Sequence, residues 1–310
     1  GASAGGLEAL TELVGAIPED SGIAYVIVQH LSPDHPTMMD QLLSHHTSLP
    51  VRVIEQGMRL APDTIYVLPP EPWVTLEGET LHLHERNREE VLRTPIDRFL
   101  VSLAEARGHD AFAVILSGTG SDGTHGVRAV KAAGGFAIVQ ESDSAQFPGM
   151  PDSAAATGLV DFVLAPRQIP DRLVDIVRHR KRFLTDDEAD DLRGAVEQAL
   201  PDILATLAGE TGYDFKNYKP GTLIRRIERR MTVLRERNVE RFKERLEDEE
   251  QERDLLLQDF LIGVTRFFRD EEAFAKLRQQ AILPLLESDR ESLRIWVPGC
   301  STGEEAYSIA

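Results

Sequence analysis

Short apolar runs alternate with helical patterns over the first 182 residues, and this alternation constrains the fold more than any other feature of the chain. The runs are rich in β-branched residues and lie at residues 24–28, 64–68, 111–116, 136–140 and 160–164. Helical patterns fill the intervals, as at residues 95–106 and 124–133. Strands separated by helices of about 10–15 residues are typical of a parallel sheet. We therefore predict a doubly wound, mainly parallel α/β domain over residues 1–182, with one hairpin at residues 74–83.

The pattern changes after residue 182. An acidic stretch at residues 185–191 indicates a linker or the cap of a following helix, so residues 183–200 are predicted to be an acidic linker. Helical periodicity then predicts a small all-helical domain over residues 201–275. A β-rich run returns at residues 293–297, before a Gly turn and an acidic helix start, so residues 276–310 are predicted to begin a further α/β domain.

Composition excludes several classes of protein. The 34 basic residues against 52 acidic ones give a net charge of −18, which disfavours nucleic acid as a partner. No run approaches the roughly 18–20 apolar residues that cross a bilayer, so no membrane insertion is expected. A single cysteine, Cys300, excludes an internal disulfide and fits the reducing cytoplasm. The chain opens on Gly1 rather than Met, which leaves room for an upstream segment.

Ser3 lies in the string GASAGG, directly before a predicted helix at residues 7–17. Small residues around one serine allow a sharp turn that exposes the hydroxyl and nearby backbone N–H groups at a helix start. Such a turn suits a nucleophile with an adjacent oxyanion hole. It suits equally a phosphate-binding loop or a plain tight turn, and the motif alone leaves all three open.

A serine nucleophile needs a base, and the base needs an orienting acid. His30 follows the predicted strand at residues 24–28, and Asp122 lies in a Gly-rich loop after the predicted strand at residues 111–116. Carboxyl ends of parallel strands meet at one edge of a sheet, so these side chains are expected to come close together. Taken singly, His30 fits an ordinary histidine, and Asp122 fits the cap of the helix that begins near Thr124. No Cys, His or Asp cluster accompanies His30, so no metal site is predicted.

The strings GASAGG, VQHLSP, LSGTGSDGTHG and FPGMP, in this order, resemble the catalytic domain of the CheB chemoreceptor methylesterases over residues 1–180. The resemblance implies an enzyme without a cofactor that hydrolyses glutamate methyl esters on chemoreceptors, with deamidation of glutamines as a second reaction. It makes Ser3 the nucleophile, His30 the general base and acid, and Asp122 the carboxylate that orients the histidine. Backbone amides of Ala4 and Thr119 would form the oxyanion hole.

Two departures from this family concern side chains beside the implied site. Members often have Thr where Ala4 stands and Met where Thr119 stands. The resemblance also implies a first strand before Gly1, which these residues do not include.

Residues 216–230 form a basic segment with six basic side chains and one acidic side chain. Four of its arginines share one predicted helical face: Arg225, Arg226, Arg229 and Arg230. Such a face is either merely solvated or a docking surface for an acidic protein or peptide.

The strings TRFFR at residues 265–269 and GCSTGEEAYSIA at residues 299–310 resemble a CheR-type chemoreceptor methyltransferase over residues 195–310. The resemblance implies a Rossmann-like domain that binds S-adenosylmethionine, and a helical domain that contacts the receptor through the four arginines. The cofactor contacts it implies are Thr265, Arg269, Gly299 and Glu304. Gly263 stands where the family often has Asn. Because most of the methyltransferase sheet is absent, we expect no methyltransferase activity from these 310 residues alone.

Together these resemblances predict a cytoplasmic CheB–CheR fusion whose partners are methyl-accepting chemoreceptors, with signalling kinases or receiver domains as further partners. Two alternatives remain. One is a non-catalytic receptor-binding module in which the triad is a relic. The other is a nucleotide-binding oxidoreductase, which would need a G-x-G-x-x-G spacing and an acidic residue where Gln29 and His30 stand.

Overall fold

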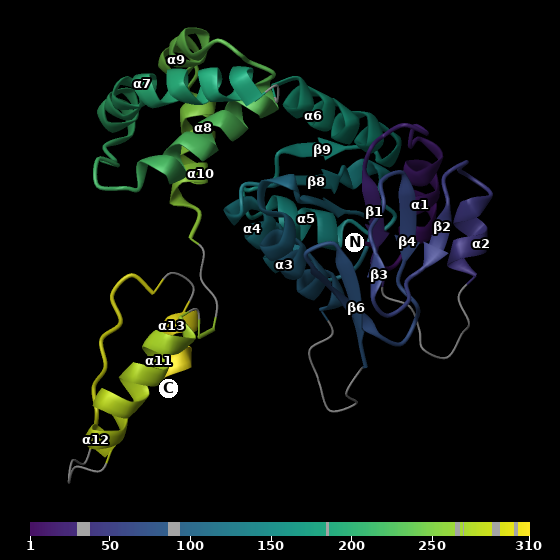
Figure 1. Ribbon diagram of the computed structural model, residues 1–310, viewed down its shortest axis with the longest axis horizontal. Coiled ribbons are helices and arrows are strands. Elements are labelled where there is room, and N and C mark those ends of the chain that lie inside the picture. Colours follow the sequence, from purple (N-terminus) through teal and green to yellow (C-terminus); the bar gives the residue numbers. More distant parts are fainter. Residues whose placement is uncertain are drawn as a thin grey trace. The chain divides into compact units, whose positions relative to one another are not determined.

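The structure is a computed structural model and forms two compact units, Gly1–Ile262 and Gly263–Ala310 (Figure 1). It describes residues 1–29, 38–85, 94–183, 186–263, 267–268, 270–286, 292–300 and 303–310.

Two three-stranded parallel sheets form the centre of the first unit. One has the order β1-β4-β2, and its strands are β1 (Ala24–Ile27), β4 (Thr64–Val67) and β2 (Val51–Val53). The other has the order β7-β8-β9, and its strands are β7 (Phe112–Ile115), β8 (Phe136–Gln140) and β9 (Phe162–Leu164). Every run of the predicted sheet is therefore a strand.

The first three residues join these two sheets. Ala2 forms a parallel bridge with Gln29, and its amide donates to the Val28 carbonyl over 3.1 Å. On the other side, the Leu116 amide donates to the Gly1 carbonyl over 2.9 Å. The backbone of residues 1–3 therefore lies between the carboxyl-terminal ends of β1 and β7 and links the two parallel sheets there. The prediction of a doubly wound, mainly parallel fold is confirmed.

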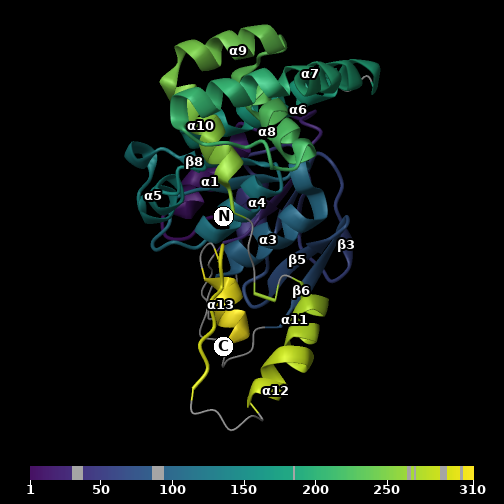
Figure 2. The same ribbon diagram turned by 90° about the vertical axis from the view of Figure 1, so that its left-hand side faces the viewer.

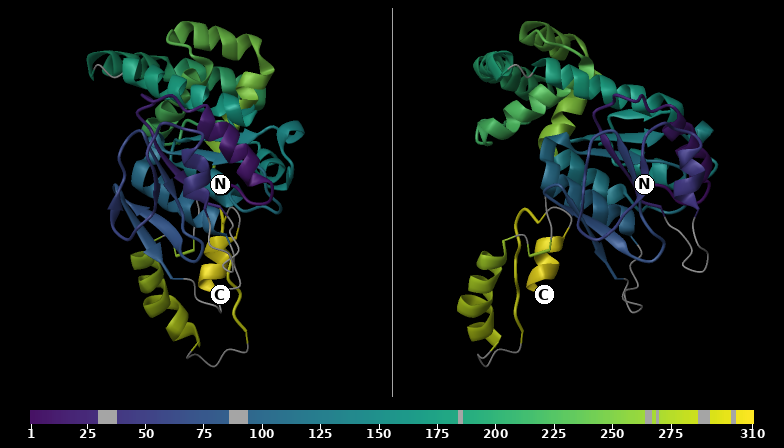
Figure 3. Two further views of the ribbon diagram at one scale, coloured as in Figure 1. Left: turned by 90° about the vertical axis from the view of Figure 1, so that its right-hand side faces the viewer. Right: turned by 45° about the vertical axis from the view of Figure 1, so that its right-hand side comes forward.

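Helices cover both faces of this layer, with the amino-terminal helix in purple on one side and the blue helices on the other (Figure 3). On one face lie α1 (Gly6–Gly15), α2 (Met39–Ser44) and α6 (Ile169–Phe183), and on the other lie α3 (Pro95–Arg107), α4 (Thr124–Ala132) and α5 (Gly149–Ala155). Side chains alternate along the strands. Ile65 and Val67 belong to the core on the α1 side of the layer, and Tyr66 belongs to the core on the α3 side. Three short 3₁₀ turns, at Gly108–Asp110, Ser142–Ser144 and Pro166–Gln168, complete the connections.

A small antiparallel sheet with the order β3-β6-β5 stands beside α3. Its strands are β3 (Met58–Arg59), β5 (Trp73–Glu77) and β6 (Thr80–His84). The predicted hairpin is confirmed, because Glu77 pairs with Thr80 across a tight turn. Gly78 adopts φ 58° there, a conformation that favours glycine.

The remainder of the first unit is helical, with α7 (Asp186–Thr211), α8 (Pro220–Leu234), α9 (Val239–Asp248) and α10 (Glu250–Leu261). Helix α7 packs against α8 and α9 (Figure 2). Helix α7 begins at Asp186, so most of the predicted acidic linker at residues 183–200 is helical, and the acidic stretch fits the second interpretation, the start of a following helix. Its acidic residues lie near the amino end of a helix, where negative charge is favoured, and Val196 and Ile203 anchor the helix in the core of the helical bundle.

The second unit contains α11 (Glu271–Leu277), a π-helical turn (Arg278–Ile282), α12 (Leu283–Leu286) and α13 (Glu304–Ile309). The predicted strand at residues 293–297 is not formed, because a strand needs a hydrogen-bonding neighbour and the described residues of this unit provide none. Trp296 is 88% exposed as a result. The predicted domain boundary after residue 275 is also wrong: it falls inside the helical run from Glu271 to Leu286, and the compact units divide at Ile262.

No helix in the described ranges combines the length and the apolar character that a bilayer-spanning segment requires.

Gly194 allows the helical assignment of α7 to be tested. Gly194 lies inside the helix, and a Cβ added there meets no atom within 4 Å. Gly194→Ala should raise the free energy of unfolding by about 1 kcal/mol, because alanine loses less backbone entropy in a helix than glycine. Urea unfolding followed by circular dichroism measures the change. A destabilised variant would contradict the helical assignment of this segment.

Candidate active site

The Ser3 turn connects the backbone at residues 1–2 with helix α1. Gly5 adopts φ 67°, and the Gly6 amide donates to the Ser3 carbonyl over 2.9 Å. A Cβ on Gly5 would lie 2.8 Å from the Ser117 hydroxyl oxygen, and a Cβ on Gly6 would lie 2.7 Å from the Ala2 Cβ. Glycine is therefore required at both positions, and the sharp turn predicted from GASAGG is present.

The loop after β7 is bound directly to this turn. The Ser3 amide donates to the Ser117 carbonyl, and the Ser117 hydroxyl donates to the Ala4 carbonyl, each over 2.9 Å. Ser117 is fully buried, and its own amide donates to the Gln140 side-chain oxygen over 2.8 Å. Sequence reasoning missed Ser117 and Gln140. The available signal was a polar residue at the end of an otherwise apolar strand.

Gly118 lies against the side chain of Ser3. A Cβ on Gly118 would lie 2.9 Å from the Ser3 Cβ and 2.2 Å from the Met150 sulfur. The backbone of Gly118 is held by the FPGMP segment: its amide donates to the Phe147 carbonyl, and its carbonyl accepts from the Met150 amide, each over 2.8 Å. The FPGMP segment thus holds the Gly118 backbone against the Ser3 side chain.

Ala4 and Thr119, the predicted oxyanion-hole residues, directly follow Ser3 and Gly118 in the chain. Since Ser3 and Gly118 are in contact, both amides belong to the two segments that meet at the serine. Within the described part of the chain, neither amide donates a hydrogen bond. Backbone donors without a protein acceptor, next to a nucleophile, are suited to binding a developing negative charge. The oxyanion role itself stays a prediction.

Asp122 is buried, with 6% of its surface exposed, and lies two residues before α4 begins. Its carboxylate accepts from the Asp97 amide over 2.9 Å and from the Ile96 amide over 3.1 Å. Asp122 therefore caps the first turn of α3, rather than the helix beginning at Thr124 as the alternative reading had it. Two backbone donors fix the orientation of the carboxylate beside the Ser3 turn.

Asp97 makes the reciprocal contact with the first turn of α4. Its Oδ1 accepts from the Gly123 amide over 2.9 Å and from the Gly126 amide over 2.7 Å. Burial raises the pKa of the Asp97 carboxyl, and the negative charge of Asp122 raises it further. Each aspartate thus holds the first turn of the other's helix, so that α3 and α4 are locked together where Asp122 sits. Sequence reasoning missed Asp97, since acidic residues are common in any first helical turn.

His30 lies outside the described residues. The bridge between Ala2 and Gln29 nevertheless places the residue before His30 beside the Ser3 turn. Asp122 is tied to the same region through Ile96: a Cβ on Gly1 would lie 2.4 Å from an Ile96 methyl carbon. The structure thus brings together Ser3, Ala4 and Thr119 with the loop that carries Asp122, and the position of the His30 side chain stays a prediction.

The predicted cofactor contacts are only partly described. Thr265 and Arg269 lie outside the described residues. Gly299 adopts φ 70°, and no atom lies within 4 Å of a Cβ placed on it. Glu304 begins α13. None of the described residues from 263 to 310 is buried, so this part does not enclose a pocket that fits S-adenosylmethionine. The cofactor role of the four residues stays a prediction.

The predicted basic stripe on α8 is wrong for three of its four arginines. Arg226, Arg229 and Arg230 are buried, and only Arg225 is exposed. Arg230 forms a two-pronged ion pair with Glu252, through hydrogen bonds of 2.8 and 2.6 Å. Acidic partners neutralise two of the buried arginines, Arg229 and Arg230, whereas Arg226 donates to the Ile262 carbonyl over 3.3 Å. Spacing alone does not reveal those partners.

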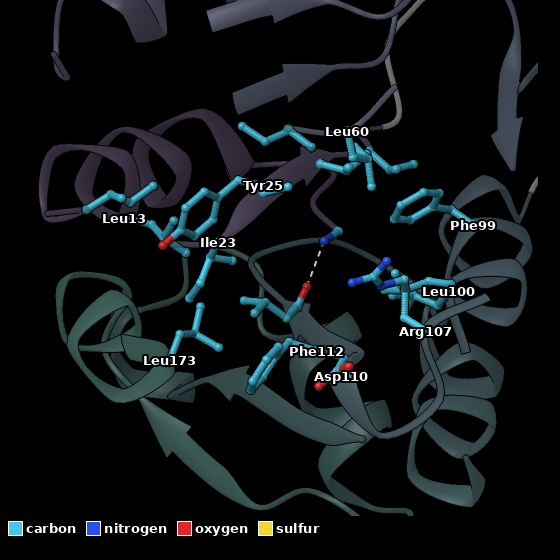
Figure 4. A pocket seen from close by; sticks show the side chains of 18 of the residues that line it. Leu13, Ile23, Tyr25, Leu60, Phe99, Leu100, Arg107, Asp110, Phe112 and Leu173 are labelled. Carbon is cyan, nitrogen blue, oxygen red and sulfur yellow. Dashed lines mark hydrogen bonds between the residues drawn. The ribbon is translucent and has the colours of Figure 1, made fainter. Parts of the chain in front are cut away.

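A cavity of about 470 Å³ lies away from the Ser3 turn, between β1 and β7 (Figure 4). Apolar side chains line most of it, including Leu13, Ile23 and Phe112, and the Gly1 amino group donates to the Val114 carbonyl at its wall over 2.7 Å. Ser3, Thr119 and Asp122 do not line it. Among the described residues no group of three metal-ligating side chains occurs. The Ser3 turn is therefore the best candidate for a catalytic centre in the described part of the chain.

Comparison with known proteins agrees with this geometry. Residues 1–173 match the family model of the CheB methylesterases. The chain belongs to the CheB methylesterase family. Residues 198–261 match the all-alpha domain of the CheR methyltransferases, and residues 263–310 match the CheR S-adenosylmethionine-binding domain. The family assignment does not support the nucleotide-binding oxidoreductase alternative.

Individual relatives cover different shares of the chain. An uncharacterized 104.1 kDa protein in the hypE 3′ region of Rhodobacter capsulatus is 43% identical over 293 residues, which are 88% of this chain and 31% of that protein. A protein-glutamate methylesterase/protein-glutamine glutaminase 2 of Burkholderia pseudomallei is 34% identical over 194 residues, covering 59% of this chain and 54% of that protein. The chain thus spans about half or less of these relatives.

A solved structure resembles the methylesterase part. The crystal structure of the Thermotoga maritima CheB methylesterase catalytic domain is 29% identical, with a TM-score of 0.51. The likeness covers 56% of this chain and 94% of that domain. The doubly wound part of the first unit therefore has the fold of a CheB catalytic domain.

Asp122 caps α3 and Asp97 caps α4, and this reciprocal capping can be tested by measuring the free energy of unfolding. Asp97→Ala removes the acceptor for two amides and should lower the free energy of unfolding by about 1–2 kcal/mol. Asp97→Asn keeps a carbonyl acceptor and should cost less. The exposed Asp143 provides the control, since Asp143→Ala should leave urea unfolding unchanged within about 0.5 kcal/mol. Equal effects of the two alanine variants would refute the cap.

Proposed function

We propose that the CheB-family part of this chain hydrolyses glutamate methyl esters on chemoreceptors, with Ser3 as nucleophile, His30 as general base and acid, and Asp122 as the orienting carboxylate. The observation that carries the proposal is the contact between Ser3 and the Gly118 backbone. It joins the serine turn to the loop of Asp122, in a domain whose family is that of the CheB methylesterases.

In the proposed reaction the Ser3 oxygen attacks the ester carbonyl carbon while His30 takes the hydroxyl proton. The amides of Ala4 and Thr119 bind the resulting oxyanion. As the tetrahedral intermediate collapses, the C–O bond to the methoxy group breaks, and His30 returns its proton so that methanol leaves. Water, deprotonated by His30, then cleaves the acyl-enzyme to give the glutamate side chain and restores Ser3.

Asp122 supports this cycle by its fixed position. The imidazolium that forms on His30 needs a carboxylate held in place, because a carboxylate that had to reorient would give back part of the stabilisation. The amides of Ile96 and Asp97 supply that restraint. Asp122 is thus a catalytic residue that is also bound into the helix packing.

The same acyl-enzyme permits a second reaction. Attack on a glutamine side chain would expel ammonia instead of methanol and, after hydrolysis, would leave the same glutamate. The Burkholderia relatives are named for both activities, as methylesterase and glutaminase. We extend this pair of activities to the present chain.

The CheR-type part is proposed to belong to the opposing activity on the same glutamates. The match to the CheR family model supports S-adenosylmethionine as its cofactor in a complete methyltransferase domain. Thr265, Arg269, Gly299 and Glu304 are the residues proposed to hold it. Methyl-accepting chemoreceptors are the proposed substrate proteins, with signalling kinases or receiver domains as further partners, and the cytoplasm is the proposed location.

Removal of the nucleophile tests the proposal. Wild-type protein should release methanol from a methylated chemoreceptor fragment, and Ser3→Ala should slow this release by about 10³-fold or more. The exposed Ser142, which donates to Asp152, provides a matched serine control, because Ser142→Ala should retain full activity. A Ser3→Ala protein as active as wild type would overturn the assignment of Ser3, and a wild-type protein that releases no methanol would favour the non-catalytic receptor-binding alternative.

The orienting acid makes a separate prediction. Asp122→Asn keeps the shape of the side chain but replaces one acceptor oxygen by a donor, so it should lower kcat by about 10²–10⁴-fold with a small change in KM. Methanol release at several substrate concentrations separates the two constants. A change confined to KM would show that Asp122 contributes to substrate binding instead.

A further inference from the structure

Four charged side chains meet in the interior of the first unit, far from the Ser3 turn in sequence. Arg229 of α8 and Asp259 of α10 come from the helical bundle, whereas Lys131 of α4 and Asp161, just before β9, come from the methylesterase domain. All four side chains are at most 5% exposed. We call this group the tetrad. Its two positive and two negative charges balance.

Both cations of the tetrad bridge both anions. Arg229 donates to Asp161 and, over 2.5 Å, to Asp259. Lys131 donates to Asp161 over 2.8 Å, and its nitrogen lies 3.3 Å from an Asp259 oxygen. One arginine thus reaches from the bundle into the methylesterase domain, and one lysine reaches back. Each domain contributes one cation and one anion, so neither side carries a net charge into the interface.

The tetrad is built into the backbone of the methylesterase domain. Arg229 Nε donates to the Gly135 carbonyl over 2.9 Å, and its guanidinium lies 5.1 Å from the Phe136 ring centre. The second oxygen of Asp161 accepts from the Ala137 amide over 2.8 Å. These contacts lie where β8 begins. The Ser3 turn lies at the carboxyl ends of the strands, which is the opposite end of the sheet along the strand direction.

Opposite charges favour the ionised forms of Asp161 and Arg229, whereas burial lowers the pKa of Lys131. Burial alone would raise the pKa of Asp161, but the charges of Arg229 and Lys131 outweigh burial and hold that pKa at about 2. Burial likewise opposes the charged form of Arg229, yet Asp161 and Asp259 raise its pKa above the ordinary value. A buried charge that loses one partner is strongly unfavourable, so the tetrad is stable only while the two domains stay together.

We propose that the Arg229 side of α8 is the docking surface for the methylesterase domain of the same chain, and that it is unavailable to a receptor while the two domains are docked. The bundle docks where β8 begins, whereas the Ser3 turn follows the carboxyl ends of the strands. Recognition and hydrolysis of a substrate therefore take place at the edge opposite the tetrad. This interface does not depend on the proposed hydrolytic activity, because none of its residues contacts the Ser3 turn.

A chain cleaved between the domains tests the docking. A recognition sequence for a specific protease is inserted between α6 and α7, and the full chain is purified folded and then cut. The two wild-type fragments should remain associated in gel filtration at micromolar concentration. Arg229→Gln and Asp161→Asn should each raise the dissociation constant of the fragments by about 30-fold or more, as expected when one partner of a buried, hydrogen-bonded charge pair is removed.

Arg225→Gln is the matched control. It changes an arginine of the same helix that is exposed and whose Nε bonds only within α8, to Gly221, so it should leave the dissociation constant unchanged. Circular dichroism of each uncut variant checks that it is folded, and Lys131→Met takes the place of any variant that is not. Separation of the wild-type fragments, or equal weakening by Arg225→Gln and Arg229→Gln, would overturn the proposal.

The double variant sharpens the test. If Arg229 and Asp161 act on each other, the combination of Arg229→Gln and Asp161→Asn should raise the dissociation constant by less than the product of the two single effects. Independent, multiplying effects would show that the two residues do not share one interaction, and would contradict the tetrad.

Discussion

The backbone of residues 1–3 is the constraint on which the methylesterase fold depends. It pairs with the end of β1 on one side, through Val28 and Gln29, and with the end of β7 on the other, through Leu116 and Ser117. The same pairing that completes the sheet therefore places Ser3 between two strand ends. The candidate catalytic centre and the link between the two sheets are two consequences of one set of hydrogen bonds, and a displacement of this segment would disturb both.

Close approach of backbones extends this constraint to the rest of the candidate site. Gly118 can touch Ser3 only because it has no side chain, and the FPGMP segment presses it there through both of its backbone polar groups. The exchange of caps between Asp97 and Asp122 then locks α3 to α4. The candidate site is thus formed by loops that are held against one another by backbone hydrogen bonds, and within the described part of the chain the amides of Ala4 and Thr119 donate none.

Sequence reasoning succeeded where the residue pattern itself carries the information. The β-branched runs became strands, the hairpin around Gly78 formed, and Ser3 and Asp122 lie in the predicted turn and loop. It failed where the outcome depends on distant partners. Residues 293–297 have strand propensity but no neighbouring strand in the described part of their unit, and the acidic residues from 186 onward extend a helix anchored by apolar residues further along the chain.

The sequence by itself determined the family, the order of the domains and the residue types of the candidate site, because motifs and hydrophobic periodicity are local properties. Only the tertiary structure decided what the arginines of α8 do. Spacing places Arg229 on the same helical face as Arg225, yet one is buried against Asp161 and Asp259 and the other is exposed. A charged side chain is buried only where opposite charges compensate it, and here those charges come from segments that only folding brings together.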